Sequence, residues 1–107
     1  MRNVTAKELV TWLDDQATTA PLLLDVREPW EYRLCHIEGS RTMPMSTVPA
    51  NVAQLEKDTP IVCICHHGMR SMQVASFLEQ QGFTDVINLT GGVDAWAAQV
   101  DSDMPTY

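Results

Sequence analysis

Short apolar runs alternate along the chain with segments in which apolar residues recur at helical spacing. The runs at residues 21–26, 61–65 and 85–89 have the length of strands, and the first is typical of a strand buried on both faces of a sheet. A further brief strand is expected within residues 39–45. Residues 61–65 ("IVCIC") are rich in β-branched side chains, so we expect this strand at the centre of the sheet.

The intervening segments predict helices over residues 6–15, 28–34, 46–55, 70–82 and 93–100. Thr5 and Glu8 form a capping-box pattern at the start of the first helix. Pro29 suits the first turn of the second helix, and Gly82 can cap the end of the fourth. The limits of the helix at 46–55 are less clear because it contains a proline.

Strands that alternate with helices through short connections predict one fold class. We expect a single α/β domain over residues 1–107, with a central parallel sheet of about five strands and helices on both faces. A chain of 107 residues with 45% hydrophobic and 20% charged residues has the composition of one globular domain. In such a sheet, ligands bind where the strands end and pass into helices.

Charge and cysteine content narrow the function classes. A formal net charge of -7 with only seven basic residues predicts neither a nucleic-acid partner nor adhesion to anionic membranes. The N-terminal sequence lacks the pattern of a secretory signal, and no apolar run reaches membrane-spanning length. Three cysteines, an odd number, are expected to be thiols rather than disulfides, and we expect a cytoplasmic protein.

The segment "ICHHGMRS" (residues 64–71) lies at one junction between strand and helix. Cys65 ends the apolar strand, Gly68 allows the backbone to curl, and the next helix begins near Arg70. Successive N–H groups of residues 66–71 can therefore converge above the sulfur and form a cradle for an anion. The helix N-terminus and the Arg70 guanidinium should favour the thiolate form of the cysteine.

Five segments of the chain resemble the single-domain rhodaneses, the thiosulfate sulfurtransferases, in order and spacing: residues 22–32, 36–40, 65–71, 88–96 and 104–107. The resemblance covers nearly the whole chain. It implies an α/β fold with a five-stranded parallel sheet and a cysteine that accepts a sulfane sulfur as a persulfide. On this sequence that cysteine matches Cys65, and the family's loop ends at Arg70.

The resemblance also implies a mechanism and a set of site residues. The Cys65 thiolate attacks the outer sulfur of thiosulfate, sulfite leaves, and cyanide, a small thiol or a cysteine of an acceptor protein then takes the sulfur. No cofactor and no metal are implied. The substrate-binding residues are the rest of the loop: His66, His67, Gly68, Met69, Arg70 and Ser71. The two histidines can add pH-dependent positive charge at the rim.

Other functions remain open on the sequence. A persulfide carrier or partner-binding module in a sulfur relay would need the same cysteine. A phosphatase is disfavoured, because four residues separate Cys65 from Arg70 where the tyrosine phosphatases have five. A metal site built from Cys63, Cys65, His66 and His67 is disfavoured too, because contiguous ligands rarely surround one ion tetrahedrally.

The other two cysteines are interpreted as structural. Cys63 lies two residues before Cys65 on the same strand, where a resolving thiol is the alternative to a buried one. Cys35 stands where the family usually has a glycine before His-Ile, and a redox role is its alternative if it is exposed.

The charged cluster after the first core strand is also interpreted as structural. It contains Asp25, Arg27, Glu28 and Glu31, and it resembles the family's own cluster at this place. Arg27 and Glu31 have helical spacing, which allows a surface ion pair worth a few tenths of a kcal/mol. His36 is expected to be an orienting, hydrogen-bonded histidine near the sheet.

Overall fold

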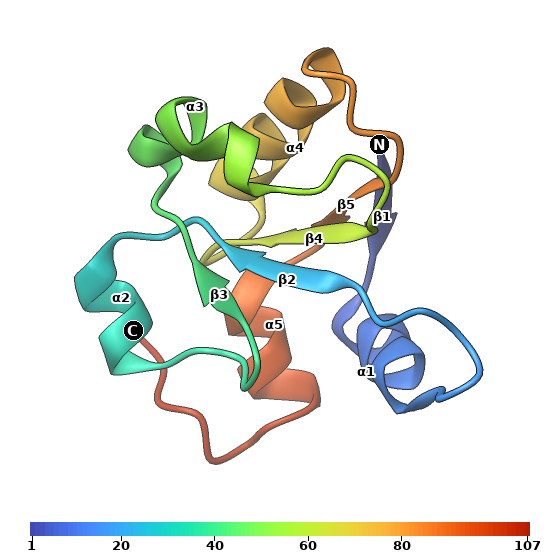
Figure 1. Cartoon of the computed structure of the whole chain (residues 1–107). Helices are drawn as coiled ribbons and strands as arrows, with labels where there is room; N and C mark the ends of the chain where they lie inside the picture. Colours follow the sequence, from blue (N-terminus) through green and yellow to red (C-terminus); the bar gives the residue numbers. More distant parts are fainter.

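Five parallel strands form the centre of the molecule, and five α-helices surround them (Figure 1). The structure is a computed structural model that describes all residues, 1–107. The strands are β1 (Arg2–Val4), β2 (Leu22–Asp25), β3 (Arg41–Thr42), β4 (Ile61–Ile64) and β5 (Val86–Leu89). The helices are α1 (Ala6–Asp14), α2 (Pro29–Leu34), α3 (Val48–Asn51), α4 (Met69–Gln80) and α5 (Gly92–Gln99). None of these helices is long and apolar enough to pass through a lipid bilayer.

The strand order is β1-β5-β4-β2-β3, and every neighbouring pair is parallel. The predicted α/β class, the parallel sheet and the central place of β4 are therefore confirmed. The sequence did not predict β1, whose first two residues are exposed and which forms no apolar run. This strand exists through its pairing with β5, in which Val4 lies opposite Leu89.

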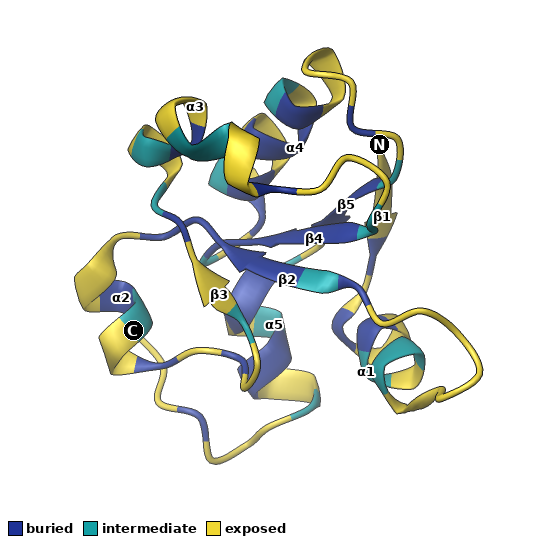
Figure 2. Cartoon of the chain, viewed as in Figure 1, coloured by how far each residue is buried: buried dark blue, intermediate teal, exposed yellow.

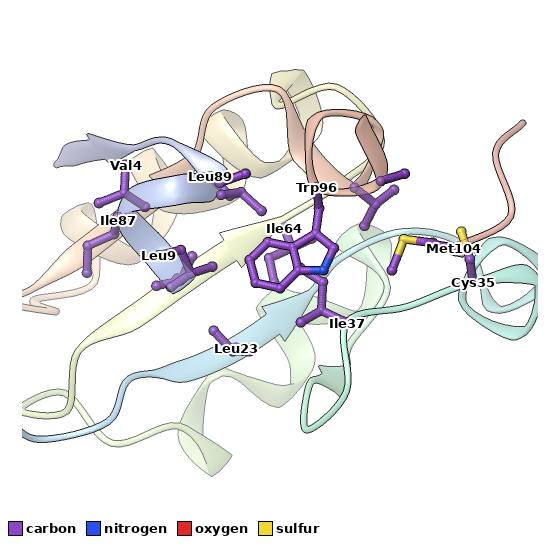
Figure 3. Close-up of a cluster of buried hydrophobic side chains, with 14 residues drawn as sticks. Val4, Leu9, Leu23, Cys35, Ile37, Ile64, Ile87, Leu89, Trp96 and Met104 are labelled. Atoms are coloured by element: carbon purple, nitrogen blue, oxygen red, sulfur yellow. The ribbon is translucent and has the colours of Figure 1, made fainter. Parts of the chain in front are cut away.

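Two apolar clusters fill the space between the sheet and its helices, one on each face. Successive residues of β2 alternate between them: Leu23 belongs to the first cluster and Leu24 to the second. The first cluster includes Leu9 of α1 and Trp96 of α5, whose indole lies over the sheet in Figure 3. The second includes Leu78 of α4. Figure 2 shows the result, with buried central strands and helices that expose their outer faces.

The predicted helix ends at α1 and α4 are confirmed. The Thr5 hydroxyl accepts from the N–H of Glu8 at 3.2 Å, and the Glu8 carboxylate accepts from the N–H of Thr5 at 2.8 Å. Beyond α4, Gly82 has a φ of +94°, and the N–H of Phe83 donates to the carbonyl of Leu78 at 3.1 Å. This is the left-handed helix cap that glycine favours.

The single helix predicted over residues 46–55 is only partly right. The chain forms a 3-10 turn at Met45–Thr47, then the short α3, then a second 3-10 turn at Val52–Gln54. Pro49 lies inside this segment and has no N–H to donate to the carbonyl four residues earlier. A continuous α-helical ladder is therefore interrupted there.

A buried ion pair joins the end of β2 to α2. Arg27 and Asp25 are both fully buried, and the guanidinium donates to the two carboxylate oxygens at 2.9 and 2.7 Å. It also donates to the carbonyl of Cys35, beyond the end of α2, at 2.6 Å. The alternative of a surface pair between Arg27 and Glu31 is wrong. Arg27 precedes α2, so helical spacing does not apply, and its side chain turns back to the sheet.

We expect Arg27→Met to lower the free energy of unfolding by about 3 to 5 kcal/mol, because it leaves the Asp25 carboxylate buried without its partner. Arg33→Met, at an exposed position of α2, is the matched control and should change it by less than about 0.5 kcal/mol. Urea denaturation of the three proteins measures both effects. Equal losses in the two variants would contradict a structural role for the buried pair.

Candidate active site

Cys65 follows directly after the central strand β4, and its residue is 1% exposed. The N–H of Gly68 donates to its sulfur at 3.0 Å, and the Ser71 hydroxyl oxygen lies 3.3 Å from the sulfur. These two groups come from the loop and from the first turn of α4. The structure therefore surrounds the sulfur with polar partners at a helix N-terminus, where negative charge is favoured.

The turn of the loop needs a glycine at position 68. Gly68 has a φ of +104°, in the left-handed region, and it precedes the first residue of α4. A Cβ added there would lie 3.3 Å from the backbone nitrogen of Gly91 and 3.4 Å from the carbonyl oxygen of Leu89. The left-handed backbone conformation and the nearby backbone of Leu89 and Gly91 thus explain why glycine occupies position 68. The sequence predicts this residue as the point where the loop curls.

The N-terminus of α5 holds the loop from outside. The N–H of Val93 donates to the carbonyl of Cys65 at 2.9 Å, and the N–H of Asp94 donates to the carbonyl of His66 at 3.1 Å. A Cβ on Gly92 would come within 2.2 Å of the Cys65 carbonyl oxygen. These bonds satisfy two helix N–H groups and turn the loop carbonyls away from the sulfur.

Arg70 is held by a carboxylate from another helix. Its guanidinium donates to both carboxylate oxygens of Glu31 at 2.6 and 2.8 Å. The hydroxyl of Tyr107 donates to the same carboxylate at 2.7 Å and accepts from Arg27 at 2.9 Å. Figure 1 accordingly places the C-terminus beside α2. The sequence predicts only a structural role for Glu31 and gives no separate role to Tyr107.

The bonds to Glu31 change its acidity. The hydrogen bonds from Arg70, and to a smaller extent that from Tyr107, lower the pKa of Glu31 from 4.5 to about 2 although burial opposes this. The same ion pair raises the pKa of Arg70. Burial is the main reason why the pKa of Tyr107 rises to about 12. At neutral pH the site therefore contains an ionised Glu31, a charged Arg70 and a neutral phenol.

The two loop histidines lie in an aromatic stack. The ring of His66 lies between those of Tyr107 and His67, with centroids 3.9 Å away on each side. Burial and the neighbouring His67 lower the pKa of His66, so this ring is mainly neutral near pH 7. His67 is exposed, and its Nε2 lies 3.7 Å from a carboxylate oxygen of Asp94. His66 therefore adds little positive charge to this rim near neutral pH.

His66, His67 and Asp94 carry potential metal-binding atoms within 4.8 Å of one another. The two imidazole planes are stacked at 28°, so their in-plane lone pairs run nearly side by side and do not converge on one point. The earlier alternative that included Cys63 is also poorly matched to the structure. Burial raises the pKa of Cys63 to about 12, which disfavours the thiolate that binds metals.

The other residues singled out from the sequence are Met69, Cys35, Cys63 and His36. The side chain of Met69 points outward, with 71% of the residue exposed. Cys35 and Cys63 are buried free thiols, as expected for structural cysteines. His36 is exposed, and its Nδ1 bonds to the carbonyl of Tyr32 at 2.8 Å. The structure thus gathers Cys65 with the loop backbone and Ser71.

Known proteins are similar to this chain in sequence and in fold. The sequence profile described as "Rhodanese-like domain" matches residues 5–99. The "Thiosulfate sulfurtransferase GlpE" of Pseudomonas paraeruginosa is 38% identical over 84 residues, which cover 78% of this chain and 76% of that protein. The "Probable adenylyltransferase/sulfurtransferase MoeZ" of Mycobacterium tuberculosis is 37% identical over 106 residues. That match covers 97% of this chain but 26% of MoeZ, so this chain spans about a quarter of that protein.

A solved structure gives the same result for the fold. The crystal structure of a rhodanese-like domain protein from Staphylococcus aureus superimposes with a TM-score of 0.85 at 29% identity, over 100% of this chain and 99% of that one. The family profile, the sequence relatives and the solved structure agree on one family. This chain belongs to the family of rhodanese-like domains.

Proposed function

We propose that this protein is a sulfurtransferase that moves a sulfane sulfur from thiosulfate or a similar donor to a nucleophilic acceptor through a persulfide on Cys65. The observation that carries the proposal is the environment of the Cys65 sulfur, which receives a backbone N–H at 3.0 Å at the N-terminus of α4. The relative named thiosulfate sulfurtransferase supports thiosulfate as the first donor to test.

The proposed reaction has two displacement steps. The Cys65 thiolate attacks the outer sulfur of thiosulfate, the sulfur–sulfur bond of the donor breaks, and sulfite leaves with the electron pair. A thiolate or cyanide then attacks the outer sulfur of the persulfide, and the Cys65 thiolate leaves. No net oxidation occurs, because the sulfane sulfur only changes partner. The Gly68 N–H stabilises the thiolate at the start and at the end of the cycle.

Arg70 is proposed to bind the sulfonate end of the donor. A guanidinium has five N–H donors, and two nitrogens already donate to Glu31, so donors remain for a second anion. Charge-assisted hydrogen bonds of this kind contribute about 1.5 to 3 kcal/mol each. Because the carboxylate partly offsets the charge of Arg70, the main effect of Glu31 is to orient the guanidinium rather than to add to the local positive charge.

The small space around the sulfur supports sulfur rather than phosphate chemistry. The residue is 1% exposed and two polar groups lie within 3.3 Å of its sulfur. One added sulfur atom needs less rearrangement of this loop than a phosphate ester does. The loop with four residues between Cys65 and Arg70 is consistent with this view.

A second candidate is a persulfide carrier that serves a protein acceptor and turns over free thiosulfate slowly. The relative MoeZ, whose name includes both adenylyltransferase and sulfurtransferase, favours this candidate because a domain like this chain makes up 26% of its length. Exposed apolar side chains near the loop, Met69 and Trp30, would suit a protein acceptor. Thiocyanate formation measured beside transfer to a protein thiol separates the two candidates.

Exposure to thiosulfate should increase the intact mass of the protein by one sulfur atom, and cyanide should then remove it. Mass spectrometry under non-reducing conditions measures both steps. Cys65→Ser should abolish the adduct, while the matched variant Cys63→Ser, which changes a buried thiol two residues away, should keep it. No adduct on the wild-type protein, or an adduct that survives Cys65→Ser, would refute the persulfide. Phosphate release from an aryl phosphate would favour a phosphatase instead.

Acid should lower the free energy of unfolding over the pH range in which Glu31 takes up a proton. Its pKa is about 2 in the folded protein against 4.5 for the unperturbed group, so its stabilisation is complete above about pH 4.5 and is lost as the pH falls toward 2. The full effect is on the order of 3 kcal/mol. Glu31→Gln should remove this part of the pH dependence of unfolding, and Glu38→Gln, at an exposed position, should leave it unchanged. Identical pH profiles for the two variants would refute this assignment.

A further inference from the structure

A chain of hydrogen-bonded side chains leads from the Cys65 sulfur to the surface at the edge of the sheet. The sulfur lies 3.3 Å from the Ser71 hydroxyl, this hydroxyl donates to the Asn88 carboxamide oxygen at 2.5 Å, and the Asn88 amide nitrogen donates to the Asn3 carboxamide oxygen at 3.2 Å. Ser71 and Asn88 are buried, at 0% and 2% exposure, whereas Asn3 on β1 is exposed.

Asn88 is the one polar residue in a strand that is otherwise apolar. Its neighbours in β5 are Val86, Ile87 and Leu89, and all four residues of the strand are buried. Burying a carboxamide costs a few kcal/mol unless it is hydrogen-bonded, and here both the oxygen and the nitrogen of Asn88 have a partner. Asn88 accepts from Ser71 through its oxygen and donates to Asn3 through its nitrogen.

The number of protons that each group can donate determines the direction of these hydrogen bonds. Ser71 has one hydroxyl proton, and the Asn88 oxygen that faces it can only accept, so this proton is used there. Toward Cys65 the hydroxyl oxygen is then an acceptor, and the proton between the two side chains belongs to the thiol. The order of bonds in this structure therefore suits the thiol form of Cys65.

The thiolate needs the opposite order. A thiolate can only accept, so Ser71 has to donate to it and accept in turn from Asn88. The Asn88 carboxamide must then present its nitrogen to Ser71 and its oxygen to Asn3, which is a half-turn of the amide. Asn3 has to turn as well, and at an exposed position it can do so with water as its alternative partner.

We propose that Asn88 is a positioning residue that sets whether Ser71 accepts from the Cys65 thiol or donates to its thiolate, and that Asn3 is the outer partner of Asn88, which water can replace. When Cys65 loses its proton to water at the loop, the carboxamides reverse and Ser71 stabilises the charge. When an acceptor takes the sulfur from the persulfide, the same reversed order receives the leaving thiolate. The inference rests on the proposed function for its role in catalysis, but the link between Asn3 and the ionisation of Cys65 can be measured without sulfur transfer.

The ionisable groups around the loop do not form this chain. None of them is hydrogen-bonded to Ser71 or Asn88. They are Cys63 on β4, His66 and His67 in the loop, Arg70 on α4, Asp94 on α5, Glu31 on α2, Arg27 after β2 and Tyr107 in the C-terminal segment. Their charges act on the sulfur equally in variants of Asn3. A change that depends on the identity of residue 3 therefore reports on the carboxamides.

The decisive variant is Asn3→Asp, which changes an exposed residue at the edge of the sheet. A carboxylate can only accept, so it holds the Asn88 nitrogen toward itself and the Asn88 oxygen toward Ser71, which is the thiol order. We expect roughly tenfold slower alkylation of Cys65 by iodoacetamide at neutral pH, because a hydrogen bond to a charged group is worth at least about 1.5 kcal/mol. The ultraviolet absorbance of the thiolate, taken as the difference from Cys65→Ser, should appear at higher pH.

Three controls separate the carboxamide chain from other effects. Thr90→Asp adds the same charge at a neighbouring exposed position without entering the chain, and it should slow alkylation much less. Asn3→Ala lets water replace the carboxamide, so alkylation should stay close to the wild-type rate. In a Ser71→Ala background, which cuts the chain beside the sulfur, Asn3→Asp should lose its effect.

Equal rates for Asn3→Asp and Thr90→Asp, or an effect of Asn3→Asp that persists without the Ser71 hydroxyl, would overturn the inference. Asn3 lies at the surface, so loss of the fold is not expected to obscure the result, and circular dichroism of each variant checks this. The outcome is also separate from that of the persulfide experiment. Suppose that Asn3→Asp slows alkylation in a protein that takes up no sulfur from thiosulfate. This result would support the carboxamide chain and refute the sulfurtransferase.

Discussion

The close contact between the N-terminus of α5 and the loop after β4 is the constraint on which the site depends. Two N–H groups of α5 bind the carbonyls of Cys65 and His66, and Gly92 leaves no room for a side chain between the two segments. Because those carbonyls point outward, the N–H of Gly68 is free to point at the sulfur. Any residue larger than glycine at position 92 would push the loop away and change the geometry around Cys65.

A second network ties charged groups from distant parts of the chain to the same loop. The buried pair of Asp25 and Arg27 meets Tyr107, which bonds to Glu31, which in turn holds Arg70. Each arginine has a carboxylate partner, so the site is close to neutral within a protein of net charge -7. Under the proposed function, an anionic donor would be recognised by N–H groups at short range rather than by a long-range positive field.

The buried carboxamide chain adds a polar path on the other side of the sulfur. The charged network approaches the loop from α2 and the C-terminal residues, whereas Ser71, Asn88 and Asn3 approach it from α4 and the edge of the sheet. Cys65 thus lies between the charged network that includes Arg70 and the carboxamide chain that begins at Ser71. The first suits the sulfonate of a donor, and the second suits a sulfur whose charge changes during a cycle.

The sequence by itself determined the elements with strong local signals. The apolar runs specified β2, β4 and β5, the capping box specified the start of α1, and the loop beginning at Cys65 was recognisable from its glycine and its place between strand and helix. Local signals of this kind depend on residues within a few positions of each other, so they survive without knowledge of the fold.

Only the tertiary structure decided the contacts between segments far apart in the chain. Arg70 lies 39 residues from Glu31, and Ser71 lies 17 residues from Asn88, so no periodicity links them. The pairing of Arg27 with Asp25 depended on where α2 begins, and β1 depended on a partner strand at the other end of the chain. Which polar groups meet around Cys65 is set by the packing of helices on a sheet, because packing brings together residues that sequence spacing cannot relate.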